Sequence, residues 1–523
     1  MPLPLPKKPG IPEIPKPTHP IINLNPEIPP LRRVEDKTKI NVRYVLIVPY
    51  VSVHIYWDPK IGEVIYEIEE PLLNEFEKKV LEELEAGLAE LVNIGAVTER
   101  SQEALLIYLD KMAKLLLSEL GRSISEESYN RIFYYLYRDF IGLNEIEPMM
   151  RDFFIEDIEC NGINTPIYVV HRLFRNLRTN VMYTDINKAA SFVEKLAQRC
   201  GRYVSYASPL LDGTLPDGSR VNATYTTDIT SKGPTFTIRK FTKVPWTPVQ
   251  LIAMNTLSPE MAAYFWILLQ YKCNILVTGG TGSGKTSMLN ALAFFIPPEA
   301  RVVSVEDTRE INLLRENWLP SVVRAGIGGV GEIDMFTLLK ESFRQNPDYV
   351  IVGEVRGKEA FVLFQAMASG HPSLSTMHAD SVEAVIRRLE TPPINLSPTL
   401  VNSLDAVAVM THAIVRKQET RRLKEIVEIV DVTPEGIAIT NTPFIWNPKD
   451  DAFYFKTESK VFEKIMKRYG ISKEQLKEEF RIRTRLLFAL YKKKIFDFET
   501  VQRIINEYYK SPETVLSKYL SKK

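Results

Sequence analysis

The stretch NILVTGGTGSGKTSMLNAL, residues 274–292, decides the fold of this 523-residue chain. An apolar segment, 274–278, is followed by a glycine-rich run and then by residues with helical spacing. This is the order of strand, loop and helix that phosphate binding requires. Chance turn glycines do not explain the string, because the GxxxxGK[ST] spacing and both flanking elements fit together. The sequence therefore predicts a P-loop inside an α/β domain.

Each residue type in this loop has a physical role in holding phosphate. Glycines allow backbone amides to point inward as a nest for an anion, and the N-terminus of the following helix adds its dipole. Lys285 is expected to reach the β- and γ-phosphates of ATP, and Thr286 to offer its hydroxyl to Mg²⁺. The predicted nucleotide-binding residues of the loop are Gly279, Gly280, Thr281, Gly282, Ser283, Gly284, Lys285, Thr286 and Ser287.

Acidic residues follow a second β-branched segment, RVVSVEDTREI at 301–311. Glu306 and Asp307 stand at the end of this predicted strand, and Glu310 follows three positions later. Carboxylates in this place position a metal ion or a water beside a P-loop, and Glu306 is a candidate Mg²⁺ ligand through water. An exposed acidic turn is the alternative, and the residues alone do not decide between the two.

A third predicted strand, 349–352, delivers Glu354 to the same edge of the sheet. In many P-loop enzymes an acidic residue here holds Mg²⁺ through water, and a neighbouring glutamate activates the attacking water. Gly353 occupies the position where the aspartate is usual. Glu354 is therefore the candidate general base, and an ordinary glutamate at a strand end is the alternative.

Two histidines, His371 and His378, flank a short predicted strand in ASGHPSLSTMHAD, 368–380. A zinc site would require a third ligand nearby and a spacing such as HExxH, and this pattern lacks both. Packed core histidines are the simple interpretation. The alternative is that one of the two, His371 or His378, senses the γ-phosphate.

The composition excludes some classes of protein. Lys and Arg number 66 against 65 Asp and Glu, so the net charge is +1, which argues against a surface built to wrap nucleic acid. Cys160, Cys200 and Cys273 have no CxxC spacing, so neither disulfides nor a cysteine zinc site are indicated, and burial is expected. No apolar stretch is long enough to span a bilayer, and the N-terminus does not resemble a secretory signal. These features predict a cytoplasmic protein.

The chain divides by pattern into five parts. Eleven of the 34 prolines lie in the first thirty residues, which favours an extended tail. After an initial strand-rich stretch, helical spacing occurs at 74–92, 102–120 and 125–140. Short alternating runs with one helix near 187–200 follow, and the two prolines of Lys243–Pro248 indicate a hinge, after which strands and helices alternate. In the last section Ser472 with Gln475 predicts a capping box. The predicted divisions are a proline-rich tail (1–35), a largely helical α+β domain (36–142), a strand-rich lobe (143–242), the P-loop domain (243–435) and a mainly helical C-terminal section (436–523).

These motifs, in this order, resemble the secretion and pilus motor ATPase superfamily, which includes ATPases of type II secretion, type IV pili, archaeal flagella and conjugative secretion. The family's Walker A motif is matched by GGTGSGKT, its aspartate box by VVSVEDTREI, its atypical Walker B motif by VIVGEVR and its histidine box by SGHPSLSTMHA. The resemblance covers residues 140–435, with weaker likeness to the C-terminus.

The resemblance implies a homo-hexameric ring whose subunits have a PAS-like lobe and a RecA-like lobe, with ATP between the lobes. The family takes arginines from its N-terminal lobe to the phosphates, and Arg220 in LPDGSRVNATY and Arg239 in GPTFTIRKF match them. Arg344 in KESFRQNPD matches a further arginine, whereas Lys340 stands where relatives carry another. The expected catalytic residues are Glu354, Lys285, Arg220, Arg239 and Arg344.

Two departures indicate a branch of the superfamily. Bacterial type II secretion members usually carry a four-cysteine zinc subdomain after the histidine box, and this chain has no cysteine beyond Cys273. The EDT form of the aspartate box, the N-terminal extension and the ending EEFRIRTRLLFALYKKKIFDFETV resemble archaeal pilus and flagellar motor ATPases. The resemblance therefore implies an archaeal type IV filament assembly ATPase that uses ATP and Mg²⁺ and acts on an integral membrane platform protein from the inner face of the membrane.

Other functions are consistent with parts of the pattern. A RecA-like DNA translocase or helicase is the main alternative, although the neutral charge and the lack of interleaved basic and aromatic residues argue against nucleic-acid binding. A nucleotide-gated scaffold without hydrolysis is disfavoured, because Lys285, Thr286 and Glu354 are all present. The run Lys492-Lys493-Lys494 indicates either a solvated helix end or a contact with anionic lipid.

Overall fold

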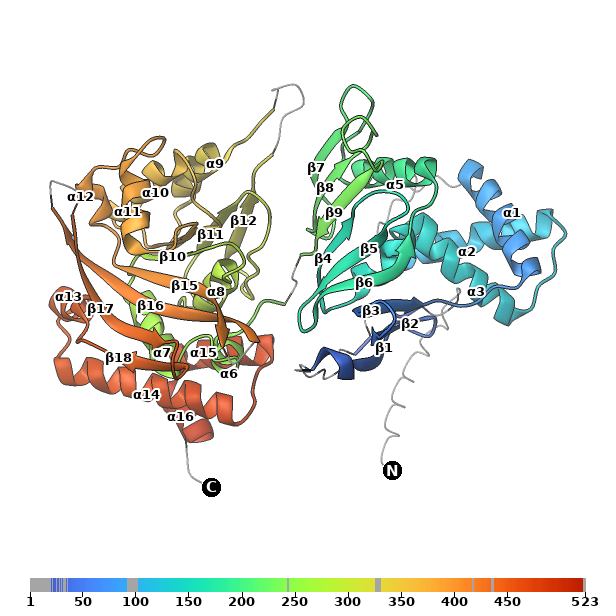
Figure 1. Cartoon of the computed structure of the whole chain (residues 1–523). Helices are drawn as coiled ribbons and strands as arrows, with labels where there is room; N and C mark the ends of the chain where they lie inside the picture. The colour runs from blue at the N-terminus through green and yellow to red at the C-terminus, as the bar shows by residue number, and fades with distance from the viewer. Residues whose placement is uncertain are drawn as a thin grey trace, which may run out of the picture. The chain divides into compact units, whose positions relative to one another are not determined.

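The computed structural model describes residues 36–91, 102–241, 244–324, 331–415, 418–433 and 437–520, with scattered positions between 20 and 34. They form two compact units, Met1–Lys240 and Phe241–Lys523 (Figure 1). Most of the predicted proline-rich tail lies outside the described residues, as does Lys243 at the predicted hinge. Among the described helices, none combines the length and hydrophobicity needed to cross a lipid bilayer. The division into five parts stays a prediction.

The first unit is built on one nine-stranded sheet with the order β1-β2-β3-β6-β5-β4-β9-β8-β7. Strand β3 pairs in parallel with β6, so strands from both sides of residue 142 share this sheet and one hydrophobic core. Its strands are β1 (Asn41–Ile47), β2 (Val51–Asp58), β3 (Glu63–Glu69), β4 (Ile155–Cys160), β5 (Pro166–His171), β6 (Arg175–Met182), β7 (Leu210–Thr214), β8 (Arg220–Thr224) and β9 (Thr235–Arg239).

Helices of the first unit lie where periodic spacing predicts them. The expected segments 74–92, 102–120 and 125–140 form α1 (Glu75–Leu91), α2 (Gln102–Glu119) and α3 (Glu126–Leu136). The chain then makes a π-helical turn, η3 (Tyr137–Ile141), which the helical spacing does not predict. The remaining helices are α4 (Glu147–Arg151) and α5 (Ile186–Arg199).

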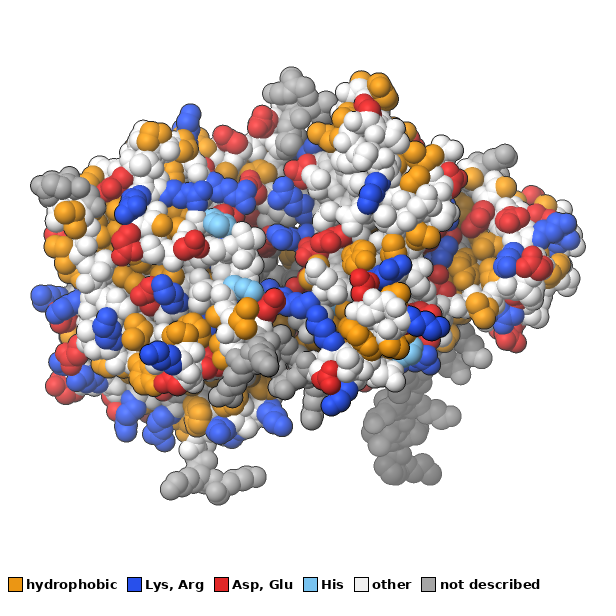
Figure 2. Space-filling model, in the orientation of Figure 1, with side chains coloured by type: hydrophobic (Ala, Val, Ile, Leu, Met, Phe, Trp, Pro, Cys, Tyr) orange, Lys and Arg blue, Asp and Glu red, His pale blue; other side chains and the backbone are white. Residues whose placement is uncertain are grey.

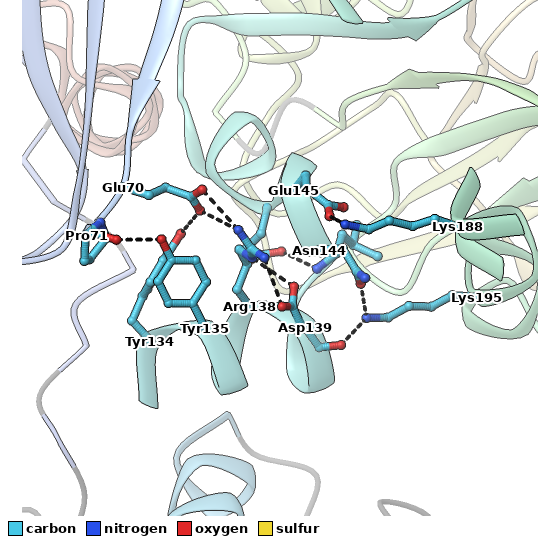
Figure 3. Close-up of polar contacts among 12 residues, drawn as sticks. Glu70, Pro71, Tyr134, Tyr135, Arg138, Asp139, Asn144, Glu145, Lys188 and Lys195 are labelled. Atoms are coloured by element: carbon cyan, nitrogen blue, oxygen red, sulfur yellow. Dashed lines mark hydrogen bonds and ion pairs between the residues drawn. The ribbon is translucent and has the colours of Figure 1, made fainter. Parts of the chain in front are cut away.

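A polar network joins η3 to its surroundings (Figure 3). Arg138 pairs with Glu70, which follows β3, at 3.1 Å and with Asp139 at 2.9 Å. The last carbonyls of a helix have no partner within it. Lys195 of α5 donates to the carbonyl of Asp139 at 2.6 Å, and Arg199 donates to that of Ile141 at 2.7 Å. The charged side chains of α5 therefore cap η3.

The second unit contains another nine-stranded sheet, with the order β12-β11-β13-β14-β10-β15-β16-β17-β18. The pairs from β12 to β15 are parallel, and those from β15 to β18 are antiparallel. The strands are β10 (Ile275–Gly279), β11 (Val302–Glu306), β12 (Trp318–Val322), β13 (Tyr349–Val352), β14 (Ser373–Met377), β15 (Ala406–Val415), β16 (Gln418–Val432), β17 (Ala438–Asn447) and β18 (Ala452–Phe455).

Helices cover both faces of the parallel strands, as strands buried on two sides require (Figure 1). Ile275 and Val277 pack in one core cluster and Leu276 in the other, because successive side chains of a strand point to opposite faces. The first cluster includes α6 (Pro248–Ala253), α7 (Pro259–Gln270), α8 (Lys285–Ala293), α13 (Lys460–Tyr469), α14 (Lys473–Lys492), α15 (Phe498–Lys510) and α16 (Pro512–Leu520), and the second includes α9 (Met335–Ser342), α10 (Glu359–Ala368), α11 (Val382–Glu390) and α12 (Pro398–Val401).

The predicted α/β fold with a P-loop domain and a helical C-terminal region is confirmed. The predicted capping box of Ser472 and Gln475 begins α14. One expectation differs: the section 436–523 begins with β17 and β18, which extend the sheet before the helices start. Strand β17 alternates little between apolar and polar residues, so its pairing with β16 is what places it. Cys160 and Cys273 are buried, and Cys200 is half-buried.

Candidate nucleotide site

The P-loop connects β10 to α8 at the carboxyl end of the parallel strands. Every residue of β10 is buried. Gly279 has φ 153°, and a Cβ there would lie 2.5 Å from the carbonyl oxygen of Met410 on the neighbouring β15. Gly284 has φ 91° and precedes the first turn of α8. No other residue type fits either position without strain, so the loop has the tight, amide-rich form expected of an anion site.

Lys285 is turned toward the loop itself. Its ammonium donates to the carbonyl oxygens of Gly279 at 3.1 Å and Gly280 at 2.9 Å. Burial lowers the pKa of Lys285, while the charges of Glu354 and Asp380 oppose that shift. Within the described residues, the hydrogen-bond partners of this half-buried cation are neutral carbonyl groups, and a phosphate oxygen would accept a stronger bond because it is itself charged.

The parallel sheet separates the two candidate histidines. Thr278 of β10 is the register partner of Met377, so His378 follows β14 at the P-loop edge. His378 Nε2 lies 2.7 Å from the hydroxyl oxygen of Thr281. His371 precedes β14 at the opposite edge, where its ring contacts Phe343 at 5.3 Å. His378 is therefore the histidine that the fold brings to the loop.

Glu306 is not part of an exposed turn, because its side chain is 1% exposed. Its Oε1 accepts hydrogen bonds from the amides of Glu310 and Ile311, each at 2.8 Å. Its Oε2 is buried and makes no hydrogen bond within the described part of the chain. Burial raises the pKa of Glu306 to about 7. Asp307 and Glu310 are exposed, so the three acidic residues have different surroundings.

Glu354 follows β13 at the same edge. Its Oε2 accepts a hydrogen bond from Arg356 at 2.7 Å. Partial burial raises the pKa of Glu354. The hydrogen bond and charge of Arg356 and the charge of Lys285 together lower that pKa by more than burial raises it, so the pKa lies below its usual value. Arg356 also pairs with Asp307 at 3.7 Å. Glu354 is thus held ionised, as a general base must be.

The glycine before Glu354 has a steric explanation. A Cβ on Gly353 would lie 3.2 Å from Cγ of Glu306, closer than most real contacts. The backbone of Gly353 also donates to Val305 and accepts from Thr376. The missing side chain of Gly353 therefore leaves room for the buried Glu306 at the end of the neighbouring strand β11.

Two further residues, Arg421 and Asp380, lie at the loop and were not predicted from the sequence. Arg421 on β16 donates from Nε to the carbonyl of Gly282 at 2.9 Å, and its Cδ would lie 3.2 Å from a Cβ on Gly284. Oδ1 of Asp380 would lie 3.2 Å from a Cβ on Gly280. No local signal marks Arg421, because 139 residues separate it from the loop. Asp380 was within the quoted histidine segment, yet only the register of β14 places it beside the P-loop.

The three predicted arginines belong to different parts of the fold. Arg220 and Arg239 are register partners on β8 and β9 of the first unit, paired with Asp212 at 3.2 Å and Asp157 at 3.4 Å. Arg344 is 76% exposed and pairs with Glu341. It precedes β13 at its amino end, so the second unit does not bring it to its own P-loop.

Comparison with known proteins gives the family. Residues 173–448 match the model of the family "Type II/IV secretion system protein", so the chain belongs to this family. The resemblance stated from the motifs is confirmed.

Individual relatives are similar over large parts of the chain. An uncharacterized protein of Methanocaldococcus jannaschii is 40% identical over 392 residues, which cover 74% of this chain and 71% of that protein. The conjugal transfer protein TrbB of Rhizobium radiobacter is 32% identical over 226 residues, 42% of this chain and 68% of that protein. The crystal structure of the ATPase DotB of Legionella pneumophila matches 68% of this chain and 92% of its own, with 17% identity and a TM-score of 0.39.

Proposed function

We propose that this chain is an ATP-hydrolysing motor that works as a homo-hexamer and powers assembly of an archaeal type IV pilus-like filament or a related secretion process. The observation that carries the proposal is one edge of the second sheet. There the P-loop, Lys285, Glu306, Glu354 and His378 follow adjacent parallel strands. Ligands of open α/β sheets bind at this carboxyl edge.

The residues of this edge have separate tasks in hydrolysis. The loop amides and Lys285 hold the β- and γ-phosphates and offset the charge that develops on the transferred phosphoryl group. Glu354, kept ionised beside Arg356, orients the water for in-line attack and accepts its proton. His378, which contacts the hydroxyl of Thr281, senses whether the γ-phosphate is present.

The site also fits a magnesium ion. Thr286 stands in the first turn of α8, and the buried Oε2 of Glu306 is an acceptor without a hydrogen bond among the described residues. Thr286 would hold the ion directly and Glu306 through water, where Mg²⁺ would neutralise phosphate charge. A carboxyl whose pKa is raised to about 7 by burial gains its charged form readily beside a cation.

Arginines complete the proposed site. Both arginines are exposed, Arg220 beside the exposed Asp212 and Arg239 beside the half-buried Asp157, and ion pairs at the surface are weak enough to exchange for a phosphate. We assign Arg344, at the opposite edge from its own P-loop, to the nucleotide of a neighbouring subunit. This division would make the site incomplete in a monomer.

The cellular setting follows from the same proposal. The motor acts in the cytoplasm at the inner face of the membrane and passes force to an integral membrane platform protein. Support comes from the family and from a relative that is named a conjugal transfer protein. A DNA translocase is not favoured by any contact within the described residues, and a non-hydrolysing scaffold does not require an ionised Glu354.

The deciding experiment compares purified wild type with Glu354→Gln. Phosphate release is measured with ATP and Mg²⁺, and light scattering after size exclusion follows the oligomer with and without nucleotide. The proposal expects turnover in wild type, its loss in the variant, and hexamers promoted by nucleotide. A monomer that hydrolysed ATP only with added DNA would select the translocase instead.

A further inference from the structure

Positive charge is concentrated in the last part of the chain, although the whole is nearly neutral. Residues 456–523 carry 18 Lys and Arg against nine Asp and Glu, whereas the 455 residues before them carry 48 against 56. Figure 2 shows Lys and Arg side chains gathered along the edge of the second unit that carries α13, α14 and α16. Such an asymmetry indicates an acidic partner for this end of the protein.

Many of these cations already have partners. Lys473 and Lys477 of α14 pair with Glu458, and Lys460 pairs with Glu463 at 2.8 Å. These lysines lie at the amino end of α14 or on α13. Two carboxylates therefore offset most of the charge of these three lysines, which reduces their attraction for an anion at a distance.

The opposite end of α14 is different. Lys492, Lys493 and Lys494 are exposed where the helix ends, and within the described residues 437–520 none of them has an ion-pair partner. Helix α16 packs against α14 and brings Lys518, likewise without a recorded acidic partner there, to the same place. Four uncompensated ammonium groups therefore share one small area.

Aromatic rings lie between these lysines. Lys492 stands over the ring of Phe488 at 5.2 Å, and Lys493 and Lys518 stand over Tyr519 at 5.5 and 5.4 Å. Phe488 is 45% exposed although the helix buries apolar residues on its other side. Tyr519 is half-buried, so Phe488 is the exposed ring of this group. Lysines that flank an exposed aromatic ring are typical of surfaces that meet a membrane interface, where the ring enters the headgroup region and the ammonium groups meet phosphates.

We propose that the basic–aromatic patch formed by Phe488, Lys492, Lys493, Lys494, Lys518 and Tyr519 binds the surface of a bilayer that contains anionic phospholipid. The patch attaches the second unit to the membrane directly, in addition to any protein platform. This inference does not depend on ATP hydrolysis. A helix end that is merely solvated would not require Phe488 to be exposed among unpaired lysines.

The test uses the full chain and vesicles of phosphatidylcholine, alone or mixed with phosphatidylglycerol. Flotation should recover the wild type with the mixed vesicles only, and added salt should release it. The variant Lys492→Gln/Lys493→Gln/Lys494→Gln should lose on the order of 100-fold in partition coefficient at about 0.1 M salt, since each cation near an anionic surface contributes about 1 kcal/mol.

A matched control removes the same number of charges. Lys460→Gln/Lys473→Gln/Lys477→Gln loses three paired lysines. Lys473 and Lys477 lie about 28 and 23 Å along α14 from Lys492, beyond a Debye length of about 10 Å at 0.1 M salt. Its partition coefficient should change by less than about threefold. Equal losses in both variants would show that only net charge matters and would overturn the patch.

A third variant separates the apolar contribution from charge. Phe488→Ser leaves the charge unchanged and removes the ring, so it should weaken vesicle binding by about tenfold if the ring enters the interface. Unchanged binding would overturn the role of Phe488.

A different outcome would assign the patch to nucleic acid. If the wild type did not bind mixed vesicles but bound duplex DNA, and the triple patch variant lost that DNA binding, the lipid proposal would be overturned. Circular dichroism confirms that each variant is folded.

Discussion

Arg421 Nε donates a hydrogen bond to the carbonyl oxygen of Gly282 at 2.9 Å, so a strand near the end of the second sheet fixes the middle of the P-loop. The donor is a charged guanidinium, and hydrogen bonds that involve a charged group contribute about 1.5–3 kcal/mol to stability. Arg421 is therefore a positioning residue for the nucleotide loop.

Arg421→Ala should weaken ATP binding about tenfold or more while leaving kcat at saturating ATP within about threefold. Arg421→Lys should restore part of the affinity, because an ammonium can still reach the carbonyl. Fluorescent nucleotide titration and steady-state kinetics give both quantities. Lys424→Ala on the same strand, where Lys424 pairs with Glu425 at 3.4 Å, is the control. A fall in kcat without a change in affinity would contradict this role.

Removal of Arg356 should move the acidic limb of the pH–rate profile to higher pH. The hydrogen bond and charge of Arg356 lower the pKa of Glu354, while burial raises it. Glu354 must be ionised to accept a proton, so activity is lost as pH falls through its pKa. In Arg356→Ala burial would act with less opposition, and the loss would begin at higher pH. Profiles of kcat/KM for wild type and variant test this, and coincident acidic limbs would remove Glu354 from the role of base.

The cross-strand pair Arg220 and Arg239 should act on catalysis from the first unit. If they reach the phosphates, Arg220→Ala and Arg239→Ala should each lower kcat/KM about a hundredfold or more, as loss of arginines from phosphoryl-transfer sites does. Lysine at either position should rescue only partly, since it lacks the two-pronged donor geometry. Arg178→Ala on β6, whose partner is Glu63 at 3.9 Å, controls for loss of a surface arginine in the same unit. Full activity in both alanine variants would refute the assignment.

His171 should make the first unit less stable in mild acid. The ring is fully buried, stacks on Phe154 and Phe174, and accepts the amide of Leu173 at Nδ1. Burial lowers the pKa of His171 from its usual 6.5 to about 4. Below pH 6.5 the histidine of the unfolded chain becomes protonated, whereas His171 in the folded unit stays neutral until about pH 4. The free energy of unfolding therefore falls by about 3 kcal/mol between these two pH values.

Urea unfolding at several pH values from 7 to 4 measures this loss. His171→Phe keeps a stacked ring but cannot titrate, so its unfolding free energy should be lower at neutral pH and flatter with pH than that of wild type. An unchanged slope in His171→Phe would show that other groups cause the acid dependence.

The sequence by itself determined the P-loop, its flanking strand and helix, and the acidic residues that follow the next two strands. Local chemistry is enough for these features, because glycines with the required spacing, a lysine at the helix start and β-branched runs each constrain only neighbouring residues. The periodicity also placed α1, α2, α3 and α5 within a few residues of their observed ends.

Only the tertiary structure decided how these pieces meet. Parallel pairing of β10 with β14 brought His378, and not His371, to the P-loop, and the neighbouring strand β11 buried Glu306 against Gly353. Antiparallel pairing through β15 carried Arg421 to Gly282 from 139 residues away. Strand register sets contacts between distant segments, whereas spacing within one segment has no access to them. The chemistry of the loop can therefore be read from its own residues, but the residues that surround it come from the order and direction of the strands.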